Sequence, residues 1–99
     1  MKFVIKGPFK ENIHSLGRKI GYNLQGEEGS ELSFTRPPRG YPRFHLFLEK
    51  KADDLVFNLH LDQKRPSYKG SPAHAGEYDG EVVENEAERI KENLESLKK

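Results

Sequence analysis

The 99-residue sequence contains no cysteine. A disulfide framework and a cysteine-based zinc knuckle are therefore excluded, and an intracellular protein is the simplest expectation. Long hydrophobic runs are also missing. The N-terminal stretch MKFVIKGPFK has only three consecutive apolar residues, Phe3 to Ile5, too few for a signal-peptide core or a membrane span. We expect a soluble cytoplasmic protein that does not enter a membrane.

A strong excess of one charge is the third missing feature. The formal net charge is +1, from 17 basic and 16 acidic residues, which argues against a general nucleic-acid coat, because such affinity comes mainly from neutralised phosphates. The charges are unevenly placed, however. Residues 36–69 hold eight Lys or Arg against four acids, and residues 70–99 hold four against eight. The middle of the chain is therefore basic and its C-terminal part acidic.

Hydrophobic patterning indicates a single α+β domain over residues 1–99, with the order βαβββα. The expected strands cover residues 2–6, 31–36, 43–49 and 55–62, with a further short strand at 22–25, and the expected helices cover residues 12–20 and 80–97. The second helix is amphipathic, because Val83, Ala87, Ile90, Leu94 and Leu97 form one apolar stripe. We predict a two-layer sandwich, in which an antiparallel sheet of four or five strands carries both helices on one face.

Strand alternation assigns each side chain to one face of this sheet. The face covered by the helices collects Phe44, Leu46, Leu48, Leu55, Phe57, Leu59 and Leu61. The other face collects Ser33, Thr35, Arg43, His45, Phe47, Val56, Asn58, His60 and Asp62. A sheet face that is merely solvated does not predict two histidines and an aspartate together.

Two chemical interpretations of this polar face use its histidines. In the first, His60 and Asp62 form a 2-His-1-carboxylate site for a divalent metal together with His74, or with His45 in place of His74. The spacing His60-x-Asp62 followed by a later histidine resembles the pattern of cupin-like proteins and 2-oxoglutarate oxygenases. In the second, no metal is involved. Two of the three histidines His45, His60 and His74 act as general acid and base, with Asp62 or Glu77 orienting one of them, as in phosphodiester cleavage. Lys64, Arg65 and Lys69 would hold the phosphate.

The third interpretation is a binding surface without a cofactor. Basic and aromatic residues alternate in RPPRGYPR and KRPSYKG, a composition that grips phosphate and stacks bases. The candidate binding residues are Arg36, Arg39, Tyr41, Arg43, Asn58, Lys64, Arg65, Tyr68 and Lys69. We favour a binding module for RNA or a protein partner, acting as a monomer or homodimer. The alternative is a small metal-dependent or histidine-dependent hydrolase.

The connection over residues 63–80 is long for so small a domain, and connections of this length are usually functional, disordered or wrongly assigned. We expect it to form an ordered lid over the polar face. On this hypothesis His74 joins His45, His60 and Asp62 in one site.

One resemblance concerns the whole chain, and two others rest on shorter stretches. The element order is similar to that of the double-stranded-RNA-binding superfold and, with its leading strand, to the ribosome hibernation factors, although the acidic last helix departs from their basic helices. The stretches YPRFHL and HLDQKRPSYKGSPAHAGEYDG resemble an uncharacterised small-protein family of candidate-phyla bacteria, which implies no function. RKIGYNLQGEEGSELSF also resembles the helix-to-hairpin part of the HicA toxins, but the corresponding hairpin has no histidine, so their RNase activity is not carried over.

Overall fold

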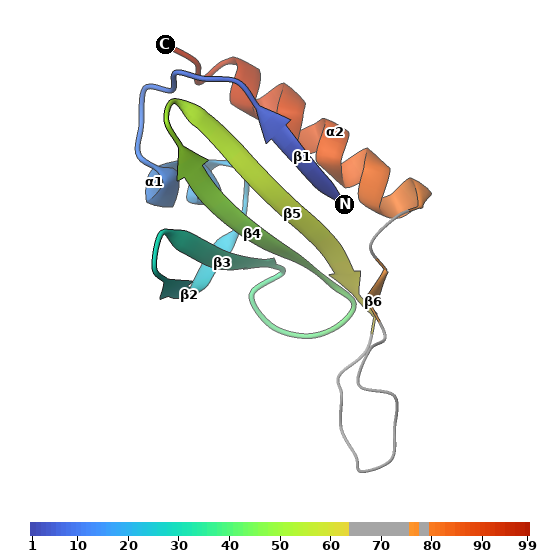
Figure 1. Cartoon of the computed structure of the whole chain (residues 1–99). Helices are drawn as coiled ribbons and strands as arrows, with labels where there is room; N and C mark the ends of the chain where they lie inside the picture. Colours follow the sequence, from blue (N-terminus) through green and yellow to red (C-terminus); the bar gives the residue numbers. More distant parts are fainter. Residues whose placement is uncertain (64–75, 78–79) are drawn as a thin grey trace.

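The structure, a computed structural model, describes residues 1–63, 76–77 and 80–99. Its strands are β1 (Lys2–Ile5), β2 (Asn23–Glu28), β3 (Glu31–Arg36), β4 (Arg43–Lys51), β5 (Asp54–Asp62) and β6 (Gly76–Glu77), and its helices are α1 (Ile13–Lys19) and α2 (Glu81–Glu95). Five strands form an antiparallel sheet in the order β1-β5-β4-β3-β2, and the short β6 pairs with β5 along the same edge as β1. Both helices lie on one side of this sheet (Figure 1). The predicted α+β architecture is confirmed.

Two hairpins differ from the expected boundaries, and β6 is a short strand within the connection expected to be a loop. The sequence predicts a short strand near residues 22–25 with a turn from Gly26, but β2 continues through Gly26 to Glu28, and a register shift between Leu24 and Gly26 accommodates the glycine. KKADD predicts a turn of several residues, but β4 and β5 continue until only Ala52 and Asp53 separate them. The result is a tight hairpin in which Ala52 has a φ of 56°, as such turns require.

The hydrophobic core lies between the sheet and the two helices. Asn12 caps α1 by accepting a hydrogen bond from the Ser15 amide at 2.9 Å. Gly17 in this helix packs against Phe34 so closely that an added Cβ would lie 2.3 Å from the ring. The buried residues of α2 include the predicted stripe of Val83, Ala87, Ile90 and Leu94. No helix within the described ranges is long and apolar enough to cross a membrane.

Glu86 is an unexpected member of the buried face of α2, with a side chain only 5% exposed. It accepts hydrogen bonds from the Tyr22 hydroxyl at 2.6 Å and from Nε and Nη2 of Arg89, both at 2.8 Å. Nη1 of Arg36, at the end of β3, lies 3.3 Å from both carboxylate oxygens. Burial acts to raise the pKa of Glu86, but the hydrogen bonds from Arg89 and Tyr22 outweigh it and hold the pKa below its ordinary value. The network therefore joins α2 to the sheet and requires an ionised carboxylate.

This network makes the stability of the fold depend on pH. A carboxyl group whose pKa is lowered on folding adds stability above its unfolded pKa, and that contribution is lost as the pH falls through the folded pKa. We expect Glu86→Gln to lower the free energy of unfolding at pH 7 by about 1–3 kcal/mol. The free energy of unfolding of this variant should also decline less steeply below pH 4.5, the ordinary pKa of a glutamate side chain. Urea denaturation across this range measures both effects.

The control is Glu92→Gln, because Glu92 is an exposed residue of the same helix. Its loss is expected to change the free energy of unfolding by less than about 0.5 kcal/mol. Equal effects of the two substitutions would contradict the structural role of Glu86.

Candidate functional site

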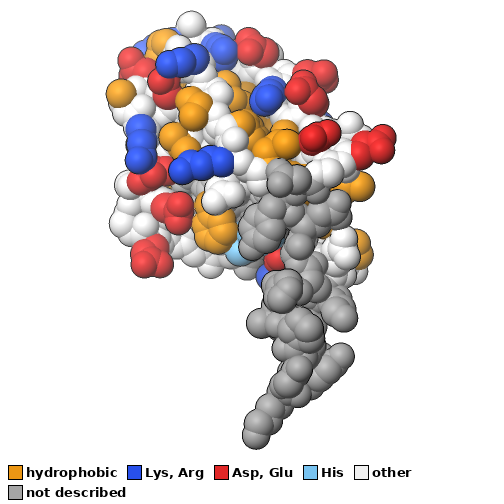
Figure 2. Space-filling model, turned by 45° about the vertical axis from the view of Figure 1, so that its right-hand side comes forward, with side chains coloured by type: hydrophobic (Ala, Val, Ile, Leu, Met, Phe, Trp, Pro, Cys, Tyr) orange, Lys and Arg blue, Asp and Glu red, His pale blue; other side chains and the backbone are white. Residues whose placement is uncertain are grey.

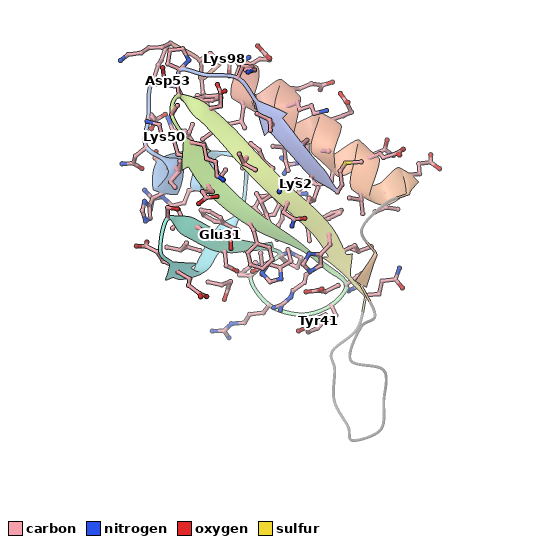
Figure 3. The ribbon with its side chains drawn as sticks, in the orientation of Figure 1. Lys2, Glu31, Tyr41, Lys50, Asp53 and Lys98 are labelled. Carbon is pink, nitrogen blue, oxygen red and sulfur yellow. The ribbon has the colours of Figure 1, made fainter. Side chains whose placement is uncertain are left out.

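The pairing of β4 with β5 brings the predicted site residues together. His45 lies opposite His60, and Arg43 lies opposite Asp62. Paired residues in neighbouring strands share a face, so all four lie on the side of the sheet away from the helices. Figure 3 looks onto this side, with Lys2 labelled on β1 and Glu31 on β3. We call Ser33, Arg43, His45, His60 and Asp62 the polar cluster.

Asp62 occupies the centre of the polar cluster. Its Oδ1 lies 3.0 Å from Nε2 of His60, and its Oδ2 lies 3.7 Å from Nδ1 of His45. Arg43 Nε approaches the same Oδ2 at 3.4 Å. On the far side of the His45 ring, Nε2 lies 2.8 Å from the Ser33 hydroxyl oxygen. One carboxylate thus lies beside two imidazoles and one guanidinium.

The two imidazoles are largely shielded from solvent. The side chain of His45 is 21% exposed and that of His60 is 11% exposed. Burial lowers the pKa of both residues, and the neighbouring His60 lowers that of His45 further, while Asp62 opposes the shift in each case. Both rings therefore favour the neutral form, which is the form that ligates metals.

The donor atoms lie near enough to one another to be candidate ligands of one metal ion. One ligand atom each from His45, His60 and Asp62 can be chosen so that all three lie within 4.8 Å of one another. Two ligand atoms bound at about 2.1 Å to a tetrahedral or octahedral ion lie about 3.0–3.4 Å apart. The distance of 3.0 Å from Oδ1 of Asp62 to His60 matches this spacing, and the distance of 3.7 Å from the other carboxylate oxygen, Oδ2, to His45 is longer than it. If Nδ1 of His45 is the ligand, Ser33 accepts from the opposite N–H, the usual support for a ligating histidine.

Three residues of the polar cluster can also be compared with a catalytic triad. Ser33, His45 and Asp62 follow one another as nucleophile, base and orienting carboxylate do in serine hydrolases. However, the separation of 3.7 Å between His45 and Asp62 exceeds hydrogen-bond distance, and Asp62 lies closer to His60. The geometry therefore fits metal ligation better than a nucleophilic serine.

Aromatic rings adjoin the polar cluster. Phe47 lies next to His45, with ring centroids 4.4 Å apart, and the centroids of His45 and His60 are 4.9 Å apart. The Arg43 guanidinium lies over the Tyr41 ring at 4.7 Å. The rings of His45, Phe47 and His60 thus lie close together on β4 and β5, and the Arg43–Tyr41 pair adds a ring from the connection that precedes β4.

The remaining predicted binding residues have different environments. Arg36 is held in part by Glu86 rather than by the polar cluster, while Arg39 and Asn58 are exposed. Glu77 lies opposite Leu61 in the pairing of β5 with β6, and Gly76 lies opposite Asp62. His74, Lys64, Arg65, Tyr68 and Lys69 lie outside the described residues, as does most of the predicted lid over 63–80. The convergence of His74 with the polar cluster stays a prediction.

The sequence alone indicates no role for two residues. Ser33 belongs to the polar cluster, and Glu86 joins α2 to the sheet. Alternation places Ser33 on the correct face, but its contact with His45 depends on how β3 and β4 pair. Thr35, predicted on the same face, is buried and accepts a hydrogen bond from Gln25 at 2.8 Å. It lies directly opposite His45 and closes that side of the polar cluster.

Comparison with known proteins gives no match to a protein-family model, to a curated protein or to a solved structure. The resemblances in element order and in sequence therefore stay predictions. The function has to be argued from the polar cluster itself.

Proposed function

We propose that the polar cluster binds a divalent transition-metal ion and that the chain is a small metal-dependent hydrolase. The observation that carries this proposal is the approach of ligand atoms from His45, His60 and Asp62 to within 4.8 Å of one another. Two imidazoles and one carboxylate on neighbouring strands are a common ligand set for zinc, iron and manganese. Three protein ligands leave positions open for water and substrate, and a metal-bound water is a nucleophile at neutral pH.

The surroundings of these ligands support the proposal. Ser33 fixes the ring of His45 from the side opposite Asp62, and the tight β4–β5 hairpin fixes the strands on which the ligands stand. Arg43 lies beside the ligating carboxylate and keeps a positive charge next to the site. Asp62 is the one acidic ligand among the described residues, so the metal and Arg43 together favour an anionic substrate such as a phosphoester or a carboxylate.

Metal binding is tested with protein that carries no His tag and has been treated with a chelator. We expect one equivalent of Zn²⁺ or Mn²⁺ to bind in isothermal titration calorimetry. His60→Ala and Asp62→Asn are expected to abolish this binding, because the first removes a ligand and the second replaces the anionic carboxylate with a neutral amide. Ser33→Ala should weaken it about 10- to 100-fold, the usual loss when the support of a ligating histidine is removed.

His14→Ala is the matched control. His14 lies on α1, pairs with Glu27 at 2.9 Å and is 44% exposed, so its removal takes away an imidazole without touching the polar cluster. Binding that persists unchanged in His60→Ala would contradict the proposal, provided that circular dichroism shows both variants folded.

A second candidate function is the binding of single-stranded RNA on the same face. It is favoured by the neighbouring rings of Phe47 and the two histidines and by the Arg43–Tyr41 stack, since sheet-borne aromatics stack bases in several RNA-binding domains. Basic and acidic side chains are mixed over the face shown in Figure 2. The electrostatic contribution to such binding is therefore expected to be small.

The RNA candidate predicts measurable binding of a fluorescein-labelled ten-nucleotide RNA in anisotropy titrations at low salt. Phe47→Ala should weaken it by about 1–3 kcal/mol through lost stacking, and Arg39→Ala should reduce its salt dependence. Arg18→Ala, an exposed arginine on α1 behind the sheet, should leave binding unchanged. Absence of binding at low salt would exclude this candidate.

A further inference from the structure

A pocket of about 530 Å³ opens at the end of the sheet where β4 begins and β5 ends. It is lined by Arg36, Pro37, Pro42, Arg43, Phe44, Leu61 and Val82. These residues come from the ends of β3 and β5, the start of β4, the connection between β3 and β4, and the first turn of α2 (Figure 1). The volume is in the range of small-molecule sites, about 300–1,000 Å³.

The apolar wall of this pocket is an uncovered end of the hydrophobic core. Arg36, Phe44 and Leu61 lie side by side across three strands, on the face that the helices cover elsewhere. Phe44 is only half-buried, and Val82 at the start of α2 is 50% exposed. Phe44 and Val82 therefore offer apolar surface that a ligand could remove from water.

The charged part of the pocket lining includes Arg36, which belongs to a group with an excess of positive charge. The buried carboxylate of Glu86 is shared by two guanidinium groups, those of Arg36 and Arg89, so these three side chains together have a net charge of +1. Arg36 is the member that lines the pocket, and its side chain is 42% exposed. Glu86 engages its Nη1, and no hydrogen bond with another described residue occupies its Nε or Nη2, which can donate to an incoming acceptor.

We infer that this pocket binds a small amphipathic anion, with an apolar body against Phe44, Leu61 and Val82 and a carboxylate against Arg36. Such a ligand contacts the apolar residues and the guanidinium at the same time. Burial of its apolar body provides affinity, and the guanidinium orients its charged group. The pocket adjoins the polar cluster through Arg43, which lines the pocket and also contacts Asp62. The inference does not require a bound metal.

The test uses the full chain without metal and 2-naphthoate as the probe, followed by ¹H–¹⁵N NMR. We expect saturable shifts of the Phe44, Leu61 and Val82 amides. The neutral analogue 2-naphthalenemethanol should bind at least about fivefold more weakly, because it lacks the charge that Arg36 recognises. Absence of saturable shifts at these amides, or equal affinity for the two probes, would overturn the inference.

Two aspartate variants make the test site-specific. Val82→Asp places a carboxylate at the mouth of the pocket in the first turn of a helix, where a negative charge is well tolerated, and should weaken 2-naphthoate binding about tenfold. Val4→Asp is the matched control, since Val4 is 52% exposed on β1 and does not line the pocket. Equal affinities of the two variants would also overturn the inference. Because no metal is added, this outcome is independent of the metal titrations.

Discussion

The antiparallel register of β4 with β5 is the constraint on which the rest of the molecule depends. It places His45 opposite His60 and Arg43 opposite Asp62 on one face, and Leu46 opposite Leu59 on the other. A slip of one residue would exchange the two faces, sending histidines into the core and leucines into solvent. The apolar face and its two helices therefore hold the polar cluster in place. The two-residue turn at Ala52 and Asp53 fixes the same register from the closed end of the hairpin.

Polar groups are buried in two places, and in both they are paired. The polar cluster uses Asp62 to partner its histidines, and the helix side uses Glu86 to join Arg36, Arg89 and Tyr22. No buried side-chain nitrogen or oxygen of residues 1–63 and 80–99 lacks a hydrogen-bond partner. Arg36 belongs to the second network and also lines the pocket at the end of the core. The helix-to-sheet packing and the proposed anion pocket thus share one guanidinium.

Much of the fold follows from local patterns in the sequence, because alternation and helical spacing are properties of neighbouring residues. The stripe of α2 and the two faces of β4 and β5 are predicted in this way. Glu86 is missed because its charge suggests exposure, although it stands three residues after Val83 and four before Ile90, on the apolar side of the helix. The contact of Ser33 with His45 depends on strand pairing between residues twelve positions apart, which alternation cannot specify. The role of Arg36 likewise depends on a helix fifty residues later in the chain.

Our central proposal is that residues brought together by the β4–β5 register bind one metal ion. The most direct test observes the ring nitrogens of the histidines. Long-range ¹H–¹⁵N NMR of the histidine side chains, recorded before and after one equivalent of Zn²⁺, identifies which nitrogens bind. We expect Nδ1 of His45 and Nε2 of His60 to shift together, while the exposed His14 keeps its signals. Unchanged signals for His45 and His60 at saturating zinc would contradict the proposed site.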